Sequence, residues 1–182
     1  MKDNIFNKIS PSEALEILKQ IAKTDKKLKK RIIELAEELF RNVDVGAVCE
    51  DVFDELDAID VHELWDRAGP KTDGYTSPED MAVEMFEEAL EPFLQETYRL
   101  FDLKMHQEAK LYCIGILKGI YQYEEESGSE FKDWAIDVPG ESFVYVVNEW
   151  KKRNSNNKYK KEMKDFISNE CPNWSEWAIN QI

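Results

Sequence analysis

The chain has 182 residues, of which 42% are hydrophobic and 12% aromatic, and its formal net charge is −14. This composition excludes a disordered chain, because enough apolar side chains are present to offset the entropy that folding costs, and the length suits one domain with its own core. The excess of carboxylates argues against nucleic acid as a partner, because phosphates are bound by Lys and Arg. We predict a single domain over residues 1–182.

Apolar residues at helical spacing predict two helices at the start of the chain. Ser10-Pro11-Ser12-Glu13 has the form of a capping box with proline at the first helical position, and it opens the first helix. Only Thr24 and its neighbours separate this helix from a second one over about residues 25–42, so we predict that the two pack as an antiparallel hairpin. The residues expected to face inward in the second helix are Leu28, Ile32, Leu35, Ala36 and Leu39.

The middle of the chain alternates between helix patterns and breaks. A third helix is predicted over about residues 44–58, and a short fourth one ends before Gly69. Two Gly or Pro breaks within residues 69–77 indicate a loop. Ser77 then opens a long helix to about residue 103, in which Pro92 removes one internal hydrogen bond and is expected to kink or restart the helix.

The segment over residues 105–125 is the most apolar helix of the chain, and we expect it at the centre of the core. Gly115 and Gly119 lie four residues apart on one side of it, where a neighbouring helix can approach closely. The β-branched run in residues 141–152 also suits a strand, but its apolar residues recur at helical spacing. With a last helix over residues 159–169, the fold class is all-α, either an irregular bundle or stacked helix pairs (α-solenoid-like), with about eight helices.

Charge is unevenly distributed along the chain. Residues 44–99 contain 17 acidic and three basic residues, whereas residues 19–31 and 151–164 contain seven basic residues each. Charged helix faces usually serve solubility, and nucleic-acid binding requires the two basic segments to meet in the fold. We therefore predict a non-enzymatic helical protein-interaction or scaffold module with an acidic central surface, a protein as its partner and no cofactor.

The alternative function is that of a magnesium-dependent all-α nucleotide phosphohydrolase. Such enzymes hold magnesium with paired carboxylates on two helices, whereas the simpler interpretation of the same residues is an acidic face in contact with water. We predict no metal or catalytic residue outside this alternative, because the chain has no Cys-x-x-Cys pair and no glycine-rich phosphate loop. The candidate carboxylates are Glu84, Glu87, Glu88, Glu91, Glu130 and Asp133.

Two predicted helix ends place large aromatic side chains beside charged ones. Trp65 and Arg67 precede the break at residue 69, and Asp133 and Trp134 precede a second break. Trp and Arg are enriched at the centres of protein interfaces, so we predict that these four residues contribute to a partner surface. The other interpretation is that both tryptophans fill gaps at the ends of helices.

Neither a membrane span nor a disulfide scaffold is predicted. No apolar run approaches the ~18–20 residues that a bilayer requires, and the start of the chain, from Met1 and Lys2, lacks the apolar core of a signal peptide. Three widely separated cysteines suit buried thiols in a reducing compartment. We therefore expect a cytoplasmic protein without a membrane partner.

Two stretches of the chain have a familiar pattern. The first is LYCIGILKGIY at residues 111–121 with its continuation EEESGSEFKDWA at residues 124–135, and the second is VHELWDR at residues 61–67 followed by Asp73-Gly74-Tyr75. Together they resemble the helical accessory region of uncharacterised prokaryotic SWIM-type zinc finger proteins. The zinc finger itself, with its Cys-x-Cys and Cys-x-His ligands, is absent here, so the resemblance implies an all-α accessory region and no zinc or nucleic-acid role.

Overall fold

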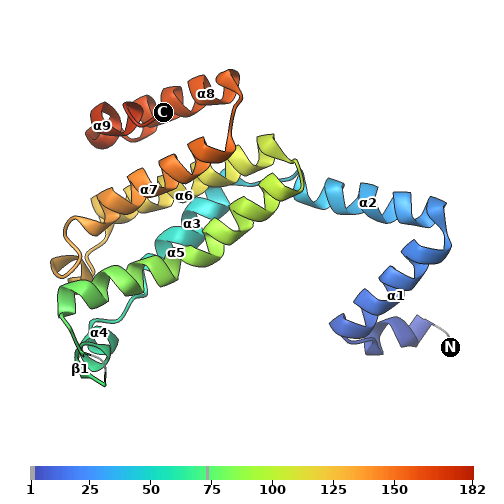
Figure 1. Ribbon diagram of the computed structural model, residues 1–182, viewed down its shortest axis with the longest axis horizontal. Helices are drawn as coiled ribbons and strands as arrows, with labels where there is room; N and C mark the ends of the chain where they lie inside the picture. The colour runs from blue at the N-terminus through green and yellow to red at the C-terminus, as the bar shows by residue number, and fades with distance from the viewer. Residues whose placement is uncertain (1–2, 73) are drawn as a thin grey trace. The chain divides into compact units, whose positions relative to one another are not determined.

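The computed structural model describes residues 3–72 and 74–182; Met1, Lys2 and the Asp73 of the second familiar stretch lie outside the described residues. The chain divides into two compact units, an N-terminal unit over residues 1–42 and a C-terminal unit over residues 43–182 (Figure 1). Each unit is described by itself below. The single domain predicted over residues 1–182 stays a prediction.

The predicted all-α class is confirmed. The described residues form nine α-helices, three short 3₁₀ helices and one two-stranded sheet. The N-terminal unit contains η1 (Asp3–Lys8), α1 (Pro11–Thr24) and α2 (Lys26–Phe40). The C-terminal unit contains α3 (Val45–Asp57), α4 (Val61–Arg67), β1 (Gly69–Lys71), β2 (Gly74–Thr76), α5 (Pro78–Asp102), α6 (His106–Glu126), η2 (Glu130–Asp133), α7 (Val138–Arg153), α8 (Asn157–Glu170), η3 (Pro172–Trp174) and α9 (Ser175–Ile179).

The helices of the N-terminal unit begin where the sequence predicts. Ser10 and Glu13 form the expected capping box, in which the Ser10 amide donates to the Glu13 carboxylate at 2.9 Å. Asp25 caps α2 by accepting hydrogen bonds from the amides of Lys27 and Leu28. These caps satisfy backbone amides that have no partner inside the helix.

The predicted antiparallel hairpin of these two helices does not form. Asp25 alone joins α1 to α2, whereas helical hairpins use loops of about two to five residues. Figure 1 shows α1 and α2 diverging from this junction instead of lying side by side. Of the residues predicted to face inward in α2, Leu28, Leu35 and Leu39 are exposed, whereas Ile32 and Ala36 are partly covered. Neither helix has a buried residue.

The C-terminal unit is built around α6, as the apolar pattern predicts. This helix contacts α3, α5, α7 and α8, and its residues Ile116, Leu117 and Ile120 are fully buried. Because α6 packs most extensively on α3, from which it is separated by α4 and α5 in the chain, the arrangement is an irregular bundle (Figure 1). A stack of helix pairs, the other arrangement considered, would restrict contacts to neighbouring pairs.

Two glycines allow α6 to lie close to α3. A Cβ atom added at Gly115 would stand 2.6 Å from Val48 Cβ, and one added at Gly119 would stand 2.7 Å from Val52 Cβ and 2.8 Å from the carbonyl oxygen of Cys49. All three distances are shorter than van der Waals contact. The close approach predicted for this side of the helix is therefore confirmed.

Within residues 69–77, predicted as a loop, residues 69–71 and 74–76 instead form two short antiparallel strands. Strand β1 pairs with β2 in the register Gly69 with Thr76 and Pro70 with Tyr75. Gly69 has a φ of 104°, a conformation that glycine adopts without the strain that a Cβ atom causes. The segments are too short to show strand periodicity in the sequence.

The following helix, α5, continues through Pro92 without ending there.

The last helices close one side of the bundle. The ambiguous segment over residues 141–152 is helical, within α7, as its spacing predicts. Phe143 of α7 is fully buried and makes edge-to-face contacts with Trp174 and Trp177 near the end of the chain. The Lys110 ammonium of α6, itself buried, pairs with Glu162 of α8. These contacts hold α8 and α9 against the core.

Candidate protein-docking surface

The most unusual surface of the molecule lies in the N-terminal unit. Eight of the 14 large hydrophobic side chains that are exposed among the described residues belong to residues 5–39. Their exposed fractions on α1 and α2 run from 43% to 78%, although apolar side chains at helical spacing are normally buried. We call this set of exposed side chains the N-terminal apolar surface. It occupies more than one side of each helix, because residues two positions apart point about 200° apart. On α1 and α2 it consists of Leu15, Ile17, Leu18, Leu28, Ile33, Leu35 and Leu39.

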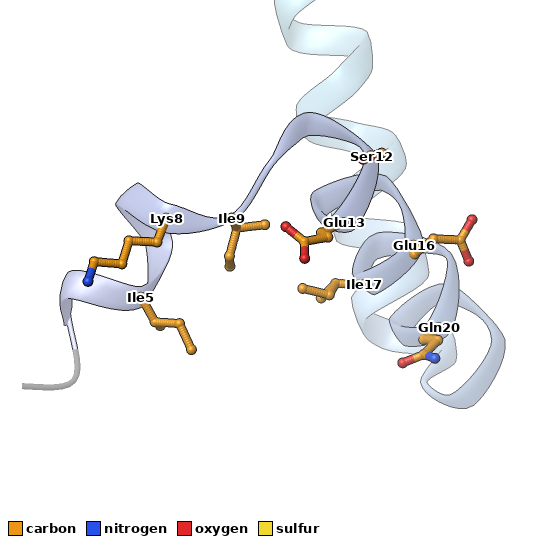
Figure 2. A pocket seen from close by; sticks show the side chains of 8 residues that line it. All are labelled: Ile5, Lys8, Ile9, Ser12, Glu13, Glu16, Ile17 and Gln20. Atoms are coloured by element: carbon orange, nitrogen blue, oxygen red, sulfur yellow. The ribbon is translucent and has the colours of Figure 1, made fainter.

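A groove of about 550 Å³ lies beside this surface, between η1 and α1. Figure 2 shows the side chains of Ile5, Ile9 and Ile17 around the groove, with Glu13 and Glu16 on the α1 side. The hydrogen bond from the Ser10 amide holds the pKa of Glu13 below its ordinary value, so this carboxylate is charged at neutral pH. An apolar floor with a charged edge is the usual chemistry of a protein-docking groove.

Helix α2 carries its charges in an order that opposes its own dipole. Its first six positions include five cations, and its later positions carry three anions, while the N-terminal end of a helix is positive and the C-terminal end negative. The ion pairs within the helix, such as Lys30 with Glu34 at 3.6 Å, are exposed and contribute little. The cations are Lys26, Lys27, Lys29, Lys30 and Arg31, and the anions are Glu34, Glu37 and Glu38.

The two tryptophans of the predicted partner surface come together. Their rings meet edge to face with centroids 4.7 Å apart, although Trp65 lies on α4 and Trp134 follows η2. Trp65 remains 49% exposed, and Trp134 is half-buried. Asp133, the neighbour of Trp134, is exposed. The pair forms one aromatic patch on the C-terminal unit, and its role in binding stays a prediction.

Arg67, the fourth residue predicted for that surface, has a different environment. Its guanidinium group donates two hydrogen bonds of 2.7 Å to the two carboxylate oxygens of Glu88 on α5. Two residues along a helix point about 200° apart, so Arg67 and Trp65 lie on opposite sides of α4. The Arg67 hydrogen bonds hold the pKa of Glu88 below its ordinary value. This pair joins α4 to α5 and is separate from the aromatic patch.

Two of the carboxylates proposed for a magnesium site share a cavity, and a third, Glu88, does not line it. Glu88 is bound to Arg67, whereas Glu87 and Glu91 line a different cavity, of about 350 Å³, together with Glu141 and Tyr145. Within residues 3–72 and 74–182, no group of three or more His, Cys, Asp or Glu side chains is placed to hold a metal ion. The phosphohydrolase alternative therefore gains no metal cluster from the described part of the chain.

The remaining predicted features are distributed over both units. The basic segment 19–31 lies in the N-terminal unit and the segment 151–164 in the C-terminal unit. Cys49, Cys113 and Cys171 are buried, free thiols, and burial raises the pKa of Cys171 to about 12. Among the described helices, none has both the length and the apolar composition needed to cross a membrane.

Comparison with models of protein families, with curated proteins and with solved structures finds no match to this chain. The resemblance to the accessory region of SWIM-type zinc finger proteins stays a prediction. The sequence did not predict the N-terminal apolar surface: Leu28, Leu35 and Leu39 were expected to face the inside of a hairpin, and Ile17 and Ile33 were given no role. Two features of the sequence could have predicted the exposure of these residues. A single residue separates the two helices, and α2 carries cations first and anions second.

Proposed function

We propose that this protein is a non-enzymatic helical interaction module whose N-terminal apolar surface docks a protein partner. The observation that carries the proposal is that neither α1 nor α2 has a buried residue, although both are amphipathic. Exposed apolar side chains that are concentrated in one part of a protein cost free energy in water and often mark an interaction site. The charged rim around the apolar residues suits a protein surface as the partner.

The C-terminal unit is the folded support of this module. Its bundle has a continuous buried core around α6, so it can hold its shape while the N-terminal unit engages a partner. The acidic residues of 44–99 cover this unit with negative charge, which keeps it soluble and repels nucleic acid. The three unpaired, buried thiols support a reducing compartment such as the cytoplasm.

The aromatic patch of Trp65 and Trp134 is a second candidate contact on the C-terminal unit. Exposed tryptophan combines a large apolar area with little loss of conformational entropy on binding. The edge-to-face packing at 4.7 Å fixes both rings before a partner arrives. A protein that docks on this patch need not contact Arg67, which is engaged with Glu88.

Site-specific photo-crosslinking in the source cell tests the proposal. A photo-reactive phenylalanine analogue replaces Leu18 or Leu39 of the N-terminal apolar surface in the full chain. The matched controls carry the analogue at Leu103 or Ile136, which are comparably exposed on the C-terminal unit. We expect covalent protein adducts from positions 18 and 39 and not from the two control positions.

Absence of adducts at both N-terminal positions, or equal adducts at the control positions, would overturn the proposed function. An adduct with another protein and an adduct between two copies of this chain both support it, because each places a protein on the N-terminal apolar surface. The two adducts differ in mass, so the experiment also shows whether the bound protein is a different one or a second copy of this chain.

A further inference from the structure

We propose that the partner of α2 is the α2 helix of a second copy of this chain, packed antiparallel. This inference rests on the proposed function, because it names the occupant of the part of that surface that lies on α2. It follows from the positions of the apolar residues and from the order of the charges along α2. Both patterns are self-complementary, which is the requirement for a two-fold interface between identical chains.

The apolar residues of α2 have the spacing of a coiled-coil seam. Leu28, Ile32, Leu35 and Leu39 follow one another at intervals of four, three and four residues, which places them alternately at the two core positions of a heptad. Leu28, Leu35 and Leu39 are exposed, and Ile32 is not buried. The seam therefore spans residues 28–39, a length of about 17 Å, and three of its four side chains are exposed.

An antiparallel pair matches this seam residue by residue. With the two-fold axis midway between residues 33 and 34, Leu28 packs against the partner's Leu39, and Ile32 packs against the partner's Leu35. Each contact occurs twice because of the symmetry. Four layers of large aliphatic side chains then cover the apolar seam of both helices.

The charges give the orientation of the pair. In an antiparallel pair the basic first half of each α2 lies beside the acidic second half of the other, and Arg31 stands on the same flank of the seam as the partner's Glu38. A parallel pair would instead place five cations beside five cations and three anions beside three anions. Like charges across a helix interface oppose association, so the antiparallel arrangement is favoured.

The same charge order disfavours packing of α1 along the length of α2. Lys19 and Lys23 lie at the end of α1 that would meet the cations of α2 in a hairpin, and Glu13 and Glu16 lie at the end that would meet its anions. A hairpin within one chain therefore brings together charges of equal sign at both ends. The antiparallel copy of α2 also offsets the unfavourable interaction of these charges with the dipole of their own helix.

Sedimentation equilibrium of the full chain tests the pairing. We expect the average mass to rise from 21.4 kDa towards twice that value between about 1 and about 500 µM, because a short two-helix seam binds with micromolar affinity or weaker. A chain that stays monomeric over this whole range overturns self-pairing. In that case the crosslinking experiment decides the proposed function: adducts with another protein at positions 18 and 39 would support it, and their absence would overturn it.

One apolar substitution tests the seam. Leu39 is 78% exposed in the single chain, so Leu39→Asp leaves the monomer fold intact and is expected to abolish association. Ile136→Asp is the matched control, because Ile136 is 73% exposed and lies on the C-terminal unit; this variant is expected to associate like the parent chain. If Leu39→Asp associates like the parent chain, or if Ile136→Asp loses association to the same extent, the proposed pairing through the seam is wrong. Circular dichroism of each variant verifies that the fold is retained.

A charge exchange tests the orientation. Arg31→Glu and Glu38→Arg each create two like-charge contacts in the antiparallel pair, so each is expected to raise the dissociation constant at least about tenfold. The double variant restores both contacts and is expected to bind within about threefold of the parent chain, as a matched charge pair does. A double variant that associates as weakly as either single variant overturns the antiparallel arrangement.

Discussion

Helices α2 and α3 differ in what their similar patterns achieve. Each follows an aspartate cap, Asp25 or Asp44, and each carries apolar residues at helical spacing. In α3 this face is buried against α6, with Val52 and Leu56 inaccessible to solvent, whereas α2 has no buried residue. An apolar stripe therefore determines which face of a helix is favourable to bury. It does not determine whether another segment of the same chain covers that face.

The difference has a physical cause in the facing helix. Gly115 and Gly119 leave α6 without side chains where α3 approaches, so the two backbones pack closely and exclude water. Residues 1–42 contain no glycine that would allow such an approach to α2. Full burial of a large aliphatic side chain contributes about 1.5–3 kcal/mol, and the N-terminal unit lacks this contribution in both of its α-helices. Helices of 14 and 15 residues are then only marginally stable alone.

The largest expected effect separates the two units directly. Leu117→Ala removes a fully buried side chain of α6 and is expected to lower the free energy of unfolding by about 3 kcal/mol, whereas Leu39→Ala is expected to cost less than about 0.5 kcal/mol in the monomer. Urea unfolding at low protein concentration measures both, with helicity by circular dichroism as the signal. A cost above about 2 kcal/mol for Leu39→Ala would break the comparison, because only a buried leucine behaves in this way.

A smaller effect is expected where α3 and α6 meet. Gly119→Ala places a methyl group 2.7 Å from Val52 Cβ, so the helices must move apart, at a cost of about 2 kcal/mol. Gly128→Ala is the control, because a Cβ at Gly128 meets no atom within 4 Å. Thermal unfolding of both variants measures the difference. Equal melting temperatures would show that the close approach does not contribute to the stability of the C-terminal unit.

The aromatic patch is expected to behave as a surface with limited packing. Trp65→Ala removes a side chain that is half in water, so the expected loss is about 1.5 kcal/mol, and the variant with Trp134→Ala in addition is expected to retain its helical spectrum. Far-UV circular dichroism of the double variant decides between the two interpretations of these residues. Unfolding of the double variant would assign both tryptophans to packing and would remove the patch as a partner surface.

The smallest expected effect depends on pH. Glu149 is buried and paired with Lys152 and Arg153, both at 2.5 Å, and the hydrogen bond from Lys152, followed by that from Arg153, holds its pKa below the ordinary value of 4.5. A carboxylate with a lowered pKa in the folded state stabilises the fold above the unfolded pKa, and this contribution is lost as the pH falls through the folded value. Glu149→Gln is therefore expected to cost about 1 kcal/mol at pH 7.

The cost of Glu149→Gln is expected to shrink as the pH falls below 4.5 and to vanish once the carboxyl group of the parent chain is protonated. Urea unfolding followed by tryptophan fluorescence at several pH values measures this trend. Glu50→Gln, at an exposed position of α3, is the control and is expected to have no effect at any pH. A cost that is independent of pH would mean that Glu149 acts through its shape and not through its charge.

Local patterns predict most of the helices in this chain. Capping residues such as Ser10 and Asp44, together with apolar spacing, determine helix starts without information from the rest of the chain. The pair Gly115 and Gly119 even predicts the side of α6 on which another helix approaches. These features depend on residues within a few turns of one another, which is why a single sequence contains them.

Features that depend on distant residues were not predictable in the same way. The contact of Trp65 with Trp134 joins segments almost 70 residues apart, and the bond of Arg67 to Glu88 removes Arg67 from that surface. The hairpin of β1 and β2 was hidden because three-residue strands have no detectable period. The exposure of Leu28 and Leu39 could not be predicted without knowing that α1 and α2 diverge.

Hydrogen exchange of the full chain at increasing protein concentration tests the central claim most directly. The claim is that the apolar face of α2 is uncovered in a single chain and becomes covered by a second copy. The predicted result is fast amide exchange in residues 26–40 at low concentration and growing protection as the concentration rises, with constant, strong protection in residues 106–126. Strong protection of residues 26–40 at the lowest concentration, without change on concentrating the protein, would contradict it.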